Sequence, residues 1–183
     1  MAKIVTLEGI ECSGKSTYLK KLQVELCHRG YRLYGYSKDD SEIDLYLRAA
    51  LQCETVTPDE QLLLMFARYL EKERIISGLQ SEYDFILLDR YCLSVKVFAK
   101  MLGLGNHINE LFQLFSHSPP IDCCLYFPLT FQEFCKRGGM ERVSVEKLTV
   151  NQNWFSLKSS EFEKEFENLA NRKIMIMPNS SFE

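Results

Sequence analysis

Several features that would mark other classes of protein are missing from this sequence. The N-terminus has no basic segment followed by an apolar one, as a secretory signal has, and no apolar run approaches the roughly 18 residues of a membrane span. The net charge is −3, so no overall positive field attracts nucleic acid or an anionic membrane. We therefore expect neither nucleic acid nor a membrane as a partner, and any anion site must be local.

Cysteines are present, but they form no disulfide or zinc pattern. The seven cysteines are odd in number and include no CxxC pair, and most of them sit in apolar runs. A disulfide framework needs paired and regularly spaced cysteines, and it is typical of oxidising compartments. The sequence therefore predicts reduced thiols and a cytoplasmic or nuclear protein.

The remaining composition is that of one ordinary globular domain, which we expect to span residues 1–183. Hydrophobic residues make up 46% and charged residues 26%, with no repeat, low-complexity tract or linker. Short apolar runs alternate with longer helical patterns, and this alternation predicts an α/β three-layer sandwich, a parallel sheet of about five strands with helices on both faces. The runs expected to form the strands are Ile4–Leu7, Arg32–Tyr36, Phe85–Leu88, Cys123–Phe127 and Lys173–Met177.

Two of the expected helices have clear start signals. Thr57 with Glu60, and Thr130 with Glu133, each place a capping hydroxyl three residues before a glutamate. Ser77-Gly78 is the expected end of the first of these helices, because glycine commonly ends a helix.

The chain opens on a phosphate-binding motif. Gly9-x-x-x-x-Gly14-Lys15-Ser16 follows the first apolar run and leads into a helical pattern, which is a complete P-loop in its usual context. The glycines let backbone N–H groups point at phosphate oxygens, and the helix start adds positive partial charge. Lys15 is expected to contact the terminal phosphates of ATP, and Ser16 to hold Mg²⁺. The expected ATP contacts in this loop are Gly9, Ser13, Gly14, Lys15, Ser16 and Thr17.

A carboxylate and a guanidinium end the third apolar run. Asp89 sits where a carboxylate can hold the water shell of Mg²⁺, and Arg90 points into the same crevice as a phosphate clamp. An ion pair on the surface is the other interpretation of these two residues alone. The Asn-Lys-x-Asp run with which GTPases read their base is absent.

The order and spacing of four segments resemble the thymidylate (dTMP) kinase family, which transfers the γ-phosphoryl group of ATP to a nucleoside monophosphate. The segments are LEGIECSGKST, LLLMFARYLEKE, LLDRYCLSVKVF and KRGGMER. The stretch PPIDCCLYF is similar to the family's approach to its fourth strand. The resemblance implies Mg²⁺ as cofactor, ATP as donor, dTMP as the leading acceptor and a homodimer.

The resemblance also assigns the acceptor site. Glu11 would contact the 3′-hydroxyl of the acceptor sugar, and Arg68 would hold the acceptor phosphate, with Leu64 on the same helical face under the base. The full acceptor set is Glu11, Lys38, Leu64, Arg68, Arg90 and Phe98. Leu64 stands where the family usually has phenylalanine, and the loop around Lys38 lacks the family's proline and arginine.

The segment KRGGMER resembles the family's lid, at about residues 134–145. Position 12 is cysteine, where some members carry a catalytic arginine and others keep that arginine on the lid. Arg137 or Arg142 would then neutralise the transferring phosphoryl group, while Gly138-Gly139 would act as a flexible joint. Lys136 is an expected ATP contact, although Lys136 and Arg137 also fit a solvated helix end. The expected catalytic set is Glu11, Lys15, Arg90, Arg137 and Arg142.

Two further alternatives follow from departures from the family pattern. MPNSSFE falls where the family has its adenine-contacting loop, which implies Ser180 as an ATP contact, and the usual last helix does not follow it. The altered acceptor positions leave open a kinase for another pyrimidine or deoxynucleoside monophosphate. They also leave open a nucleotide-binding homologue without catalysis.

Overall fold

A computed structural model describes residues 1–36, 45–46, 49–50, 53, 55–115, 120–144, 150–170 and 172–177, with the side chains of 142–144 excepted. Its centre is one parallel sheet with the strand order β2-β3-β1-β4-β5. The predicted α/β fold is therefore confirmed. The strands are β1 (Lys3–Glu8), β2 (Leu33–Tyr36), β3 (Phe85–Asp89), β4 (Cys123–Tyr126) and β5 (Arg172–Met175).

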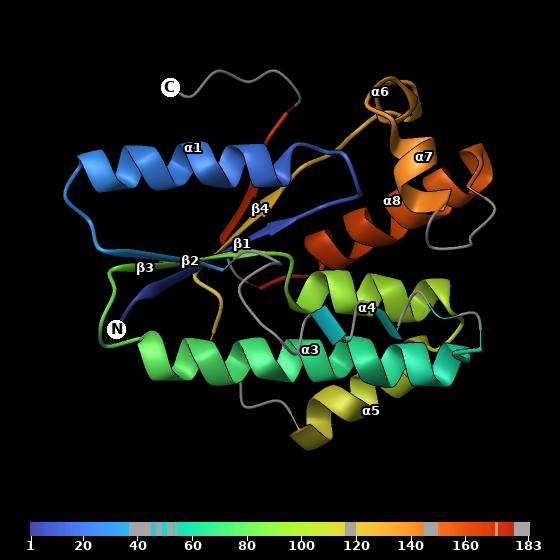
Figure 1. Ribbon diagram of the computed structural model, residues 1–183, viewed down its shortest axis with the longest axis horizontal. Helices are drawn as coiled ribbons and strands as arrows, with labels where there is room; N and C mark the ends of the chain where they lie inside the picture. Colours follow the sequence, from blue (N-terminus) through green and yellow to red (C-terminus); the bar gives the residue numbers. More distant parts are fainter. Residues whose placement is uncertain are drawn as a thin grey trace.

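Helices cover both faces of the sheet (Figure 1). Helix α1 lies on one face, and α3, α4, α5 and α8 lie on the other, while α6 and α7 stand beyond the ends of β1 and β4. The helices are α1 (Lys15–His28), α3 (Pro58–Leu79), α4 (Cys92–Met101), α5 (Gly105–Phe115), α6 (Phe131–Lys136), α7 (Gly139–Ser144) and α8 (Gln152–Glu167).

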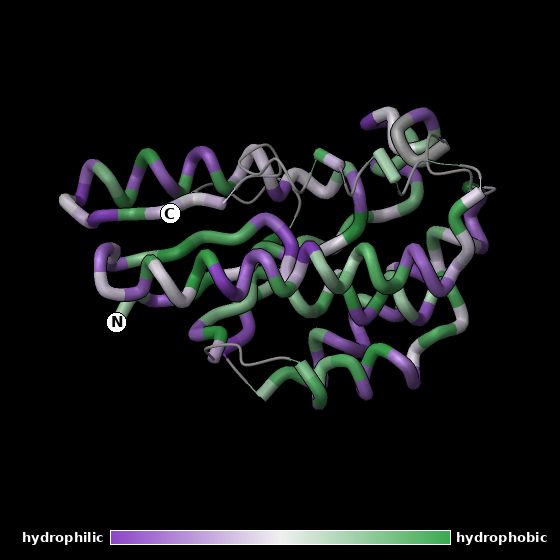
Figure 2. The backbone as a smooth tube through the Cα atoms, turned by 60° about the horizontal axis from the view of Figure 1, so that its bottom comes forward, coloured by the Kyte–Doolittle hydropathy of each residue, from purple (hydrophilic) through white to green (hydrophobic). Residues whose placement is uncertain are grey.

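The central strands form these layers because both of their faces are apolar. On one face Leu7 and Leu87 pack with Leu19 of α1. On the other face Ile4 and Ile86 pack with residues of α3, α4 and α5. The tube in Figure 2 is correspondingly hydrophobic through the centre, whereas the outer helices alternate between hydrophobic and hydrophilic turns.

Both predicted capping boxes are present. The Thr57 and Thr130 hydroxyls accept hydrogen bonds from the backbone N–H groups of Glu60 and Glu133, whose carboxylates accept bonds in return. The predicted end of α3 at Ser77-Gly78 was wrong, because the helix continues through Gly78 to Leu79. The helix extends by this one residue, and the Leu79 side chain packs against the core.

In the described part of the chain, none of the seven cysteines forms a disulfide bond, and their reduced state stays a prediction. Among the described residues, no helix has both the length and the apolarity that a membrane crossing requires.

Candidate active site

The loop between β1 and α1 has a shape that only its glycines permit. Gly9 has φ 144°, and a Cβ there would lie 2.6 Å from the carbonyl oxygen of Phe127. Gly14 has φ 96° and immediately precedes the first residue of α1. The loop therefore passes close to the residue after β4. It then turns at Gly14 into the start of α1.

Lys15 lies at the centre of this loop and is buried. Its Nζ donates hydrogen bonds to the carbonyls of Gly9 (3.0 Å) and Ile10 (2.6 Å) and to Oγ of Ser13 (2.9 Å). Burial, and then the charge of Arg90, lower the pKa of Lys15 to about 7, against the raising effect of nearby carboxylates. The phosphate oxygens of a nucleotide would compete with these three oxygens for the ammonium group.

Ser16 and Asp89 meet at the mouth of the loop. The Ser16 hydroxyl donates to Oδ2 of Asp89 over 2.6 Å. Asp89 is the last residue of β3, paired in register with Leu7 of β1. A hydroxyl and a carboxylate are ligands that Mg²⁺ accepts, and Mg²⁺ usually takes only one or two protein ligands beside phosphate and water. The pair therefore fits the metal that the sequence predicts, and the described residues hold no group of three or more potential metal-binding side chains.

Glu11 is held by two cations from distant parts of the chain. Its Oε1 accepts from Arg90 (3.1 Å), and both of its oxygens accept from Nζ of Lys158 on α8 (2.9 Å each). Burial would raise the pKa of this carboxyl, but the charges of Lys158 and Arg90 outweigh burial and bring the pKa to about 2. Glu11 is therefore an anion throughout the physiological range.

Sequence reasoning missed Lys158. It lies 147 residues from Glu11, in a helix whose charges give no sign of a partner in the P-loop. Its ammonium group is 4.7 Å from the centre of the Trp154 ring, one turn earlier on α8. That spacing of an aromatic residue and a cation is the only local signal that the sequence carried.

Glu8 was missed as well, although it directly precedes the predicted loop. It is fully buried, and it accepts hydrogen bonds from the backbone N–H of Tyr91 (2.7 Å) and from the Ser94 hydroxyl. Burial raises the pKa of Glu8, against weaker lowering effects from Ser94 and Arg90. This carboxyl ties the end of β1 to the first turn of α4.

The backbone at Arg90 is unusual and is supported by α3. Arg90 has φ 65°, a conformation that non-glycine residues rarely adopt. Nζ of Lys72, a buried α3 residue that sequence reasoning also missed, donates to the carbonyls of Asp89 (3.1 Å) and Arg90 (2.8 Å). This turn directs the Arg90 side chain toward Ser94 and Glu11.

The predicted lid contacts the P-loop. Arg137, between α6 and α7, donates through Nη1 to the carbonyl of Cys12 (3.2 Å), 125 residues earlier in the chain. The same nitrogen would lie 3.7 Å from a Cβ built on Gly14. The structure thus brings Arg137 to the loop that contains Lys15.

The two lid glycines have separate structural reasons. Gly138 has φ 72°, and a Cβ on Gly139 would come within 2.3 Å of the Phe134 ring. Phe134 packs with Trp154 of α8 and Ile10 of the P-loop. The turn between α6 and α7 therefore needs both glycines, and their role as a flexible joint stays a prediction.

The other predicted residues have simpler surroundings. Arg68 and Leu64 are partly buried on α3, one turn apart, and Arg68 directs Nη1 to Sδ of Met65 (3.7 Å). Phe98 is partly buried on α4. Thr17 and Lys136 are exposed. Lys38, Ser180 and the side chain of Arg142 lie outside the described residues.

Comparison with known proteins places the chain in one family. The family model for thymidylate kinase matches residues 7–182. The human thymidylate kinase is 32% identical over 150 residues, which cover 76% of this chain and 68% of the human protein.

Solved structures agree on the fold. A thymidylate kinase from Candida albicans has a TM-score of 0.70 at 17% identity, covering 98% of this chain and 85% of the other. One from Ehrlichia chaffeensis has a TM-score of 0.72 at 18% identity, covering 98% and 89%. Together with the family match over nearly the whole length, these findings show that the chain belongs to the thymidylate kinase family.

Proposed function

We propose that this chain transfers the γ-phosphoryl group of ATP to dTMP. The single observation that carries this beyond family membership is the contact of Arg137 with the Cys12 carbonyl. It brings a lid cation to a P-loop that has no arginine of its own. Phosphoryl transfer needs such cations around the equatorial oxygens of the transferring group.

The donor side is formed by the P-loop. Lys15 would bind the terminal phosphates of ATP, and the backbone N–H groups at the start of α1 would bind the others. Ser16 and Asp89 would hold Mg²⁺, which supplies charge neutralisation of the phosphate oxygens when bound. Arg137 would approach the same phosphates from the lid.

The acceptor side is formed by residues from three separate elements. Arg68 of α3 and Arg90 at the end of β3 would bind the phosphate of dTMP, and Glu11 would accept a hydrogen bond from its 3′-hydroxyl. A phosphate oxygen of dTMP then attacks the γ-phosphorus, and the bond from that phosphorus to the bridging oxygen of ADP breaks. Lys15 and Arg137 stabilise the charge on the oxygens of the transferring group.

A coupled assay for ADP with a panel of monophosphates tests this proposal. We expect Mg²⁺-dependent turnover of dTMP above that of dUMP, dCMP, UMP and CMP, and its loss in Lys15→Ala. Preference for another monophosphate would change the assigned substrate from dTMP to that monophosphate. Leu64, which stands where the family usually has phenylalanine, would then be the first residue to test for base selection. Absence of turnover with every acceptor, despite ATP binding, would instead favour a non-catalytic homologue.

The proposal includes a homodimer and a single domain over residues 1–183. Sedimentation at several concentrations would measure the assembly state. A single cooperative unfolding transition would support one domain.

A further inference from the structure

We propose that Lys158 is a positioning residue of the acceptor site, which holds the Glu11 carboxylate in place so that Arg90 can turn from Glu11 to the acceptor phosphate. This inference rests on the proposed function, because it concerns the acceptor that the kinase would bind. It adds a residue from α8 to a site otherwise expected from the P-loop, α3 and β3.

Lys158 makes more hydrogen bonds to the Glu11 carboxylate than Arg90 does. Lys158 contacts both Glu11 oxygens at 2.9 Å, whereas Arg90 contacts Oε1 alone at 3.1 Å. Arg90 also donates to Ser94 over 3.2 Å. When Arg90 leaves for a phosphate, Glu11 therefore keeps two charge-assisted hydrogen bonds and remains compensated in a mostly buried position.

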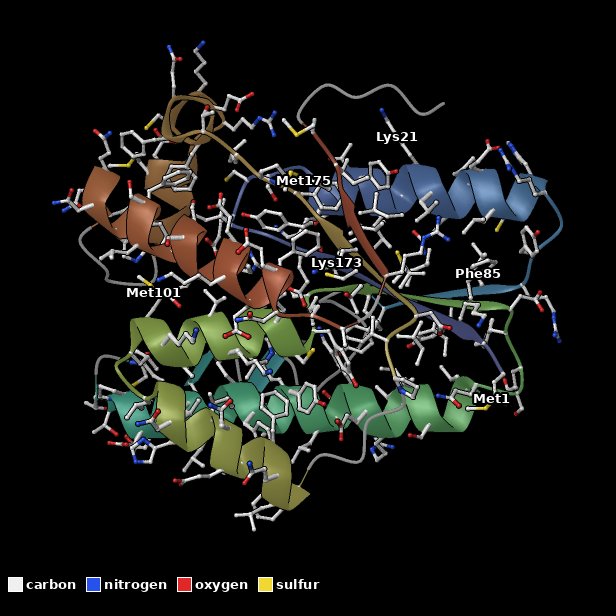
Figure 3. The ribbon with its side chains drawn as sticks, turned by 180° about the vertical axis from the view of Figure 1, so that it is seen from behind. Met1, Lys21, Phe85, Met101, Lys173 and Met175 are labelled. Carbon is white, nitrogen blue, oxygen red and sulfur yellow. The ribbon has the colours of Figure 1, made fainter. Side chains whose placement is uncertain are left out.

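Lys158 is fixed strongly enough to serve this role. Its side chain is 7% exposed, and its ammonium group lies over the Trp154 ring. Below it, Phe162 and Phe166 of α8 pack against α4 and β4 in one cluster. Figure 3 labels Met101 between α4 and α8, where it contacts this cluster and the one containing Trp154.

Ion pairs at the same interface hold α8 against α4. Lys100 of α4 pairs with Glu161 (2.9 Å) and Glu165 (2.8 Å) of α8. Lys96 lies 3.8 Å from Glu165. These pairs restrain α8 one and two turns beyond Lys158, so the Lys158 ammonium group stays directed at the P-loop.

The charges around Glu11 make the idea testable by pH. Lys158 faces it from α8, Arg90 from the end of β3 and Lys15 from the start of α1. With all three present, the pKa of Glu11 lies at about 2, below its ordinary value of 4.5. Without Lys158, Glu11 stays buried but loses the charge that lowers its pKa most, so the pKa of Glu11 rises. Activity that needs the Glu11 anion is then lost at a higher pH than in the unaltered protein.

The test compares Lys158→Met and Lys158→Arg with the matched control Lys164→Met, an exposed residue of the same helix. Steady-state kinetics with dTMP are measured from about pH 5 to about pH 8, where an ordinary carboxylate is ionised. The Glu11 pKa of about 2 lies below this range, so the unaltered protein should show no acid limb from Glu11 within it. For Lys158→Met we expect such an acid limb of kcat/KM for dTMP to appear in the lower part of the range, because burial then raises the Glu11 pKa. We also expect KM for dTMP to rise about tenfold, with kcat at the upper pH little changed. Lys158→Arg should keep the pH profile and the KM for dTMP close to those of the unaltered protein. Lys164→Met should change neither the pH profile nor the KM.

A second measurement is independent of turnover. The carboxyl carbon of Glu11 is followed by ¹³C NMR, with Glu11→Gln used for assignment. In the unaltered protein Glu11 should titrate well below its ordinary range, and in Lys158→Met its pKa should rise. An ordinary Glu11 pKa in the unaltered protein, or one that Lys158→Met leaves in place, overturns the proposal even if that variant folds poorly.

The two proposals fail in different ways. An unaltered protein that transfers no phosphoryl group counts against the kinase assignment, while the NMR titration still decides whether Lys158 holds Glu11. A rise in KM that is the same at every pH, with no acid limb from Glu11 in the measured range, would show that Lys158 only stabilises the fold near the site.

Discussion

The proposed donor side and the proposed acceptor side of this site are built in different ways. The proposed donor side comes almost entirely from one contiguous segment, Gly9–Thr17, with Asp89 and Arg137 in contact with it. On the proposed acceptor side, the fold brings Glu11 into contact with Arg90 and Lys158, which are 79 and 147 residues away in the chain. A contiguous motif carries its geometry with it, whereas a dispersed site depends on how helices pack.

The largest expected effect is on the donor side, where one cation occupies the centre of the loop. Lys15→Ala should lower kcat by about 10²–10³-fold or more, because the transferring phosphoryl group loses a buried cation. The coupled assay with dTMP measures it, and a thermal melt checks that the variant folds. Near-normal turnover in a folded Lys15→Ala protein would remove the P-loop from the mechanism.

The lid should contribute nearly as much. Arg137→Ala is expected to lower kcat about 10²-fold with little change in either KM, because a lid cation acts mainly on the transition state. Arg142→Ala is measured in parallel. The control is Lys21→Ala, an exposed cation on the outer side of α1 (Figure 3).

If kcat falls by less than about tenfold in both lid variants, the lid covers the site without contributing to the chemistry. Replacing Cys12 by arginine in the Arg137→Ala background sharpens this test. A partial recovery of kcat would show that charge from either side of the phosphate serves the reaction.

On the acceptor side a smaller effect on binding is expected. Arg68→Ala should raise KM for dTMP at least about tenfold, since a hydrogen bond to a charged group is worth about 1.5–3 kcal/mol. KM for ATP should stay unchanged. Arg74→Ala, an exposed arginine of the same helix, is the matched control. Loss of ATP affinity instead would assign Arg68 to the donor side or to the core.

The smallest expected effect concerns stability and the buried carboxyl of Glu8, at the end of β1. Burial raises the pKa of Glu8, so the stability that its protonated form contributes is present at low pH and is lost as pH rises through the raised pKa. Glu8→Gln, which stays neutral, should therefore gain Tm relative to the unaltered protein as pH rises. Thermal melts from about pH 5 to about pH 8 measure this, and each kcal/mol shifts Tm by about 2–4 °C. A constant Tm difference would show that Glu8 does not titrate in this range.

Much of the fold followed from local pattern. The alternation of apolar runs and helices predicted the parallel sheet, and both capping boxes formed as expected. The end of α3 falls one residue later than expected, at Leu79, whose side chain packs against the core. A local stop signal thus shifts when the next residue can be buried.

The sequence by itself determined the P-loop, because the glycine positions, the lysine and the helix start all lie within Gly9–Thr17. It also determined the strand that ends at Asp89 and the presence of a basic segment late in the chain. Only the tertiary structure decided that Lys158 meets Glu11, that Lys72 supports the turn at Arg90, and that Arg137 meets the P-loop. A charged side chain on a helix has the same local pattern whether it faces solvent or a distant carboxylate, and only packing chooses between them.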